Sequence, residues 1–120
     1  MGADSLITRR FHSEISELLA SGFMGGSGTL FHLEQLSWKC HAELMGDERV
    51  VCAGVAGFLD RLAQHQDGEA VTAADAASLC SMVAQPLSRC LDYLIGRDSG
   101  VAPQTLLGDL TAAYDRWLEH

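Results

Sequence analysis

Residues 76–94, AASLCSMVAQPLSRCLDYL, contain the most regular hydrophobic pattern in the chain. Apolar side chains recur there at alternating intervals of four and three residues, at Ala76, Cys80, Val83, Leu87, Cys90 and Leu94. This spacing places them along one side of an α-helix and favours packing against a nearly parallel neighbour. Because Pro86 lacks the backbone N–H that helical hydrogen bonding needs, we expect it to kink or split this helix near Gln85.

Two further helices are predicted near the N-terminus. The first begins at Asp4 or Ser5 and ends at Gly22, and the second is capped by Thr29 and extends to about Met45. The apolar stripe of the first helix consists of Ile7, Phe11, Ile15 and Leu18. The apolar seam of the second consists of Leu30, Leu33, Leu36, Ser37, Cys40 and Leu44. Both patterns have the spacing of an amphipathic helix.

A tight hairpin is predicted at Gly46-Asp47, since glycine suits the position after a helix end and aspartate suits the next cap. The following helix extends from about Glu48 to His65, and its apolar positions are Val51, Val55, Phe58 and Leu62. A strand over residues 50–55 is the weaker alternative. Gly54 and Gly57 each cost about 1 kcal/mol relative to alanine inside a helix, so we expect another helix to approach closely there.

The last predicted helix starts at Pro103, which suits a first helical position. Its apolar line is Leu106, Leu110, Ala113 and Trp117, flanked by Leu107 and Tyr114. About five helices joined by brief loops indicate an all-α, up-and-down bundle forming one domain over residues 1–117. Residues 118–120, Leu-Glu-His, resemble the start of a vector-encoded histidine tag, and we expect them to be a tag remnant.

The composition of the chain limits which partners and which cellular compartment we expect for the protein. The formal charge of −8 argues against nucleic acid, which requires a clustered basic patch. The longest apolar run, residues 50–59, is shorter than the roughly 20 residues of a membrane-spanning helix. Arg9-Arg10 is followed by Phe-His-Ser-Glu rather than by a signal-peptide apolar region. We therefore expect an acidic cytoplasmic protein with reduced cysteines and without a membrane or nucleic-acid partner.

The sequence contains no recognisable catalytic arrangement. The glycine-rich stretch Gly25 to Thr29 lacks the lysine and the preceding strand of a phosphate-binding loop. No glutamate is followed by histidine three residues later, and no two histidines are four residues apart, so the usual helical metal ligands are missing. We therefore assign no catalytic residue, no metal ligand and no cofactor.

Two cysteines are predicted to meet across the hairpin. Cys40 and Cys52 are each six residues from Gly46, which places them at the same level on adjacent helices. Together with His41 they define a candidate ligand pocket. Cysteine is also a common small core residue, and simple packing is the favoured interpretation of all four cysteines.

A second stripe of the helix that starts at Thr29 carries the candidate interaction surface. It consists of Phe31, Glu34, Trp38, His41 and Met45. Trp and Met favour protein interfaces, whereas the alternative is that this stripe is the flank of a wide core face. We therefore expect a protein-interaction or regulatory module that self-associates, as a homodimer, or binds another protein. The alternative function is a small-molecule or metal sensor that holds its ligand between helices beside Cys40, Cys52 and His41.

Overall fold

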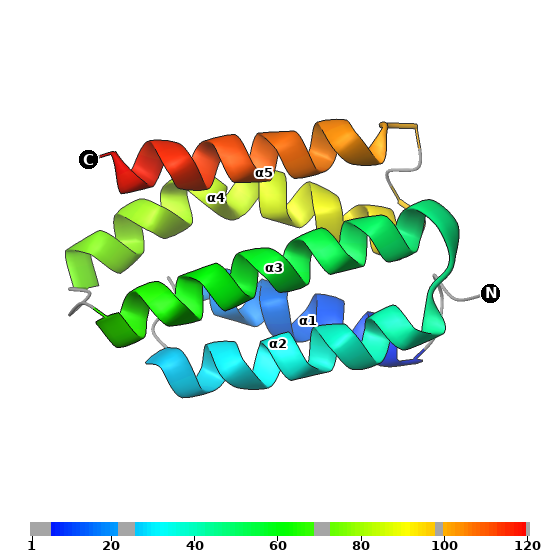
Figure 1. Ribbon diagram of the computed structural model, residues 1–120, viewed down its shortest axis with the longest axis horizontal. Helices are drawn as coiled ribbons and strands as arrows, with labels where there is room; N and C mark the ends of the chain where they lie inside the picture. The colour runs from blue at the N-terminus through cyan, green and yellow to red at the C-terminus, as the bar shows by residue number, and fades with distance from the viewer. Residues whose placement is uncertain (1–5, 22–25, 69–72, 98–99, 120) are drawn as a thin grey trace.

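The computed structural model describes residues 6–21, 26–68, 73–97 and 100–119, and all regular secondary structure in these ranges is α-helical. The helices are α1 (Leu6–Ala20), α2 (Gly26–Glu43), α3 (Gly46–Gly68), α4 (Ala73–Leu94) and α5 (Pro103–Leu118) (Figure 1). The predicted all-α fold with five helices is confirmed. The strand alternative for residues 50–55 is wrong, because this segment lies inside α3.

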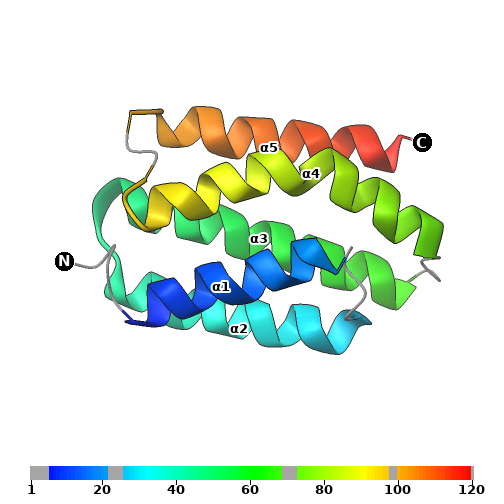
Figure 2. The same ribbon diagram turned by 180° about the vertical axis from the view of Figure 1, so that it is seen from behind.

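The five helices form two layers. Figure 1 shows α2, α3 and α5 side by side in one layer, and Figure 2 shows α1 and α4 in front of them from the opposite side. Helices that follow one another in the chain are antiparallel, so the bundle is of the up-and-down type. The molecule measures 40 × 25 × 21 Å along its principal axes. Helix α3 lies in the middle of its layer and contacts α2, α4 and α5.

One continuous hydrophobic core connects all five helices. The predicted seam of α2 is buried throughout, and its one polar member, Ser37, has no exposed surface. The predicted stripes of α1, α3 and α5 also face the core, with Ile7 only partly buried at the edge. In α4 the predicted seam is buried except at Cys80, which is half-buried at the periphery. Periodicity therefore identified the packing face of each helix correctly.

Some predicted helix ends differ from the structure. Helix α2 begins at Gly26, so the prediction that Thr29 caps it is wrong, and Thr29 lies within the helix. Gly46 has a φ angle of +63°, a left-handed conformation that glycine adopts without steric cost, which confirms the hairpin glycine. The predicted cap at Asp4 or Ser5 and the predicted stop at Gly22 lie outside the described residues.

Pro86 bends α4 without interrupting it. The helix is continuous from Ala73 to Leu94 with Pro86 inside, and Figure 2 shows it changing direction near its middle. Val83 and Leu87, on either side of the proline, are both fully buried. The bend therefore keeps both halves of α4 on the core. Pro103 occupies the start of α5, as predicted, where its missing N–H has no helical partner to lose.

Candidate functional site

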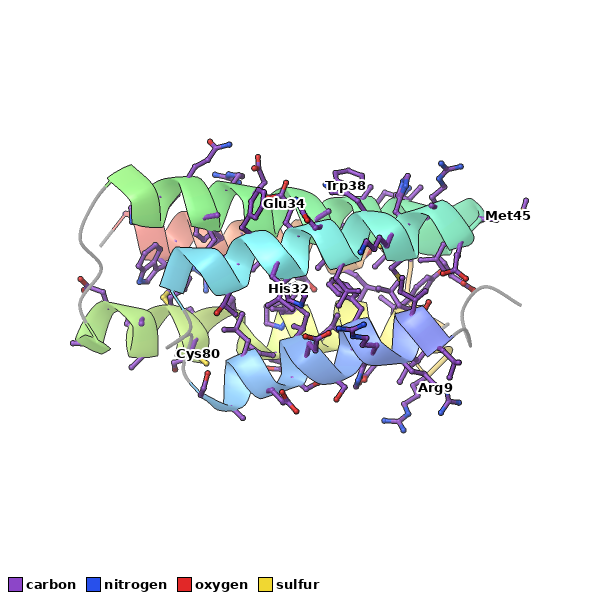
Figure 3. All side chains as sticks on the ribbon, turned by 90° about the horizontal axis from the view of Figure 1, so that it is seen from below. Arg9, His32, Glu34, Trp38, Met45 and Cys80 are labelled. Atoms are coloured by element: carbon purple, nitrogen blue, oxygen red, sulfur yellow. The ribbon has the colours of Figure 1, made fainter. Side chains whose placement is uncertain are left out.

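Three large apolar side chains in α2 and just after it are exposed rather than packed in the core. Phe31 is 58% exposed and Trp38 46%, both within α2, and Met45, two residues after the helix ends at Glu43, is 83% exposed. They are spaced by seven residues, and Glu34 and His41 lie between them. We call these five residues the Trp38 face. Figure 3 shows Glu34 and Trp38 projecting from α2 on the side of α3, away from α1. The three apolar side chains thus border the outer surface of the α2–α3 pair and do not line the core.

His41 connects the Trp38 face to α3. Its ring packs edge-on against Trp38, with ring centroids 5.2 Å apart and an interplanar angle of 75°. From α3, the Arg49 Nε donates a hydrogen bond to His41 Nε2 at 3.3 Å. Because Nε2 accepts this bond, the proton of a neutral His41 ring lies on Nδ1, which then acts as a donor. Sequence reasoning missed Arg49, since only the hairpin geometry brings it beside a residue eight positions earlier.

Two glycines of α3 border the side of this helix that faces α5. A Cβ atom placed on Gly54 would overlap the Leu107 side chain of α5, which confirms the close helix approach predicted there. A Cβ atom placed on Gly57 would meet no atom within 4 Å, so the approach predicted at that position is absent. Between α3 and α5 lies an open groove of about 390 Å³ whose lining includes Gly54, Gly57 and Tyr114. Arg61 borders it, with its guanidinium carbon 4.9 Å from the Tyr114 ring centroid and its Nη2 3.3 Å from Asp115 Oδ1. The Arg61 guanidinium therefore interacts with two residues of α5, Tyr114 and Asp115.

The second predicted site, the Cys40–Cys52 pair, lies deep in the core. Both residues have no exposed surface, and each thiol affects the pKa of the other. The Cys52 thiol is also within donating distance of the Ser37 carbonyl oxygen, at 3.2 Å. The Thr8 hydroxyl, from α1, lies 3.3 Å from Cys40 Sγ. The predicted juxtaposition across the hairpin is confirmed, whereas the Thr8 contact joins residues 32 positions apart and left no signal in the sequence.

This hydrogen bonding makes the two thiols chemically unequal. The hydrogen bond from Cys52 lowers the pKa of Cys40 to about 7, against the effect of burial, and the bond to Thr8 acts in the same lowering direction. The same hydrogen bond to Cys40, together with burial, raises the pKa of Cys52. The two thiols therefore ionise as a coupled pair, in which Cys40 loses its proton more readily than Cys52.

The structure separates His41 from the two cysteines that were predicted to share a pocket with it. Cys40 faces the core, whereas the neighbouring His41 contacts Trp38 and Arg49 on the outer surface. Among the described residues, no group of three or more His, Cys, Asp or Glu side chains is arranged to hold a metal ion. The open grooves between α3 and α5, α1 and α2, and α4 and α5 are not lined by cysteine. The thiol pair therefore has no third metal ligand among the described residues, and it does not open onto any of these three grooves.

Comparisons with known proteins provide no relative from which to transfer a function. No protein-family model, no curated protein and no solved structure matches this chain. Within the described ranges, the helices are too short or too polar to cross a membrane. Any function assigned to this chain therefore depends on the geometry of its own residues.

Proposed function

We propose that this protein is a protein-interaction module and that the Trp38 face is its binding surface. The proposal depends on one observation: Phe31 and Trp38 on α2 and Met45 just after it are all exposed to solvent. A contiguous line of large apolar side chains on the surface is typical of a binding site, whereas single exposed apolar residues are ordinary. Since five helices have already buried their seams, covering this line requires another molecule.

The residue types along the Trp38 face support the same proposal. Tryptophan is among the residues that most often dominate binding energy at protein interfaces, and methionine adapts its shape to a partner. The polar members, Glu34 and His41, supply a charged group and a hydrogen-bonding ring beside the apolar line. No catalytic arrangement accompanies them among the described residues, so binding is the activity that this surface supports.

A sensor function, with a ligand at Cys40 and Cys52, is the second candidate. It is favoured by the proximity of the two thiols, which is a suitable start for a site that binds a thiophilic ligand. It is opposed by the position of His41 on the outer surface and by the lack of cysteine in the lining of the three open grooves. Native mass spectrometry of freshly purified, reduced and chelator-free protein tests it directly, because a bound ligand adds mass that is lost on unfolding.

Photo-crosslinking in cells tests the interaction function. A photoreactive phenylalanine analogue is placed at position 38 and, in a control protein, at position 118, where Leu118 is 43% exposed on α5. We expect position 38 to form a discrete protein adduct, with this chain or with another, that position 118 does not form. Equal adduct patterns at the two positions, or no adduct at position 38, would contradict the proposed function.

A further inference from the structure

The spacing and the charges of the residues in the Trp38 face indicate what kind of molecule would bind there. Phe31 lies seven residues before Trp38 on the same helix, about 10 Å away at 1.5 Å per residue. Met45 lies seven residues after Trp38 in the sequence, two residues beyond the end of α2 at Glu43, so a large apolar residue stands on each side of Trp38. Within α2, Phe31, Glu34, Trp38 and His41 are spaced by three, four and three residues, which is the spacing of a seam that packs along another helix.

The polar groups on the two sides of Trp38 differ in charge. Glu34 lies on the N-terminal side of Trp38, whereas His41 and Arg49 form a hydrogen-bonded donor cluster on the C-terminal side. The ring nitrogen of His41 that does not accept from Arg49 is a donor, and the Arg49 guanidinium is permanently charged. A surface with a carboxylate at one end and the Arg49 guanidinium at the other is complementary to itself after rotation by 180°.

We propose that the occupant of the Trp38 face is a second copy of this chain, packed about a twofold axis beside Trp38 with the two α2 helices antiparallel. This proposal rests on the proposed function and names its partner. In this register Phe31 of one copy faces Met45 of the other, and Trp38 faces Trp38. Glu34 of each copy then faces the His41–Arg49 cluster of the other. A parallel arrangement would place Glu34 against Glu34, which is unfavourable because like charges repel.

The outer side of α3 allows this approach. A standard interface buries about 800 Å² on each partner, which is more than one helical stripe provides, so α3 must contribute to it. At Gly57, which borders the groove between α3 and α5, an added Cβ would meet no atom within 4 Å, and Ala53 is also small, so neither residue obstructs an approach to α3. The chain's net charge of −8 opposes association at long range, which favours measurement at physiological salt, where the Debye length is about 8 Å.

Sedimentation velocity from low micromolar to high micromolar concentration tests the proposal. We expect the wild-type protein to associate into a dimer, Trp38→Asp to remain a monomer, and Leu118→Asp to behave as wild type. Glu34→Lys places a lysine opposite Arg49, and Arg49→Glu places two carboxylates opposite each other, so each change is expected to weaken the dimer about tenfold or more. Thermal unfolding followed by circular dichroism checks that every variant folds.

The decisive measurement mixes the two charge variants. A dimer of one Glu34→Lys chain with one Arg49→Glu chain has opposite charges at both of its polar contacts, so the mixture is expected to associate about as well as wild type. A wild-type protein that stays monomeric throughout overturns the second copy as the occupant, and the crosslinks at position 38 then show separately whether another protein binds. Charge variants that all associate like wild type, while Trp38→Asp does not, overturn the antiparallel register alone.

Discussion

The isobutyl group of Leu107 lies directly against the Cα atom of Gly54, where α5 packs beside α3. A Cβ atom added to Gly54 would come within 2.8 Å of Leu107 Cδ1 and closer still to Cδ2, distances that real Cβ contacts do not show. The absence of a side chain at position 54 is therefore what allows α5 to approach α3 at this point. Gly57, one turn further along α3, has no such neighbour.

Alanine substitution at the two glycines is expected to give opposite results. Gly57→Ala removes the conformational cost of a mid-helix glycine without a clash, so it should stabilise the protein by about 0.5–1 kcal/mol. Gly54→Ala gains the same helix propensity but displaces Leu107, and overpacking of this kind costs about 1–3 kcal/mol. Urea unfolding should therefore rank Gly57→Ala above wild type and Gly54→Ala clearly below Gly57→Ala.

A double-mutant cycle isolates the cause of the difference. In a Leu107→Ala background the obstruction is removed, so Gly54→Ala should become nearly as favourable as Gly57→Ala. If Gly54→Ala remained equally unfavourable without the Leu107 side chain, the close approach would not be the reason for glycine at this position.

The order in which the four cysteines react with an alkylating reagent is expected to depend on how accessible each sulfur is, rather than on the pKa of its thiol. Cys80 is the one half-buried cysteine, although burial raises its pKa and its thiol donates to the Leu19 carbonyl at 3.1 Å. Cys40 has a lowered pKa but no exposed surface. Because a reagent must reach the sulfur, alkylation of native protein followed by peptide mass mapping should label Cys80 first. Labelling of Cys40 at a comparable rate would mean that the α2–α3 core opens readily.

Alkaline pH is expected to destabilise the protein through Cys90. Burial raises the pKa of this thiol to about 12, and Cys90 is fully buried. Since the unfolded chain releases the proton near pH 9 and the folded chain retains it, the stabilisation is complete below about pH 9 and is lost as pH rises towards 12. Each unit of pH in this window costs up to about 1.4 kcal/mol for one proton.

Comparison of Cys90→Ala with wild type measures this contribution. Between about pH 8 and pH 11 the wild-type free energy of unfolding should fall by about 2–3 kcal/mol more than that of Cys90→Ala, under reducing conditions. Cys80→Ala is the matched control and should keep most of the wild-type pH dependence. Parallel pH profiles for wild type and Cys90→Ala would show that Cys90 ionises normally in the folded protein.

The Cys40–Cys52 contact is expected to appear as an energetic coupling. Cys40→Ala and Cys52→Ala should each destabilise the protein by about 1–2 kcal/mol, because each removes buried volume and a hydrogen-bonding partner. The double variant should cost less than the sum, since the second substitution breaks a contact already lost. Cys40 combined with Cys90 is the control pair and should be additive. Full additivity for Cys40 with Cys52 would contradict a direct interaction.

The sequence by itself was sufficient for the fold and for the inward face of each helix. Stripes such as Leu30 to Leu44 and Leu106 to Trp117 have a local periodicity, and any folding of an amphipathic helix must bury that side. The Gly46 hairpin was predictable for the same reason, because its left-handed conformation is a local property of glycine. The contact of Cys40 with Cys52 followed from that hairpin, since both lie equally far from the turn.

Only the tertiary structure decided which of the remaining apolar side chains are exposed and how much space surrounds each helix. Periodicity could not establish whether the line of Phe31, Trp38 and Met45 was a core flank or an exposed face, since that depends on how many helices pack around α2. It also could not distinguish Gly54 from Gly57, because only the position of α5 sets the space at each. Local periodicity determines which side of a helix is apolar, whereas the arrangement of distant helices determines which apolar side chains remain exposed.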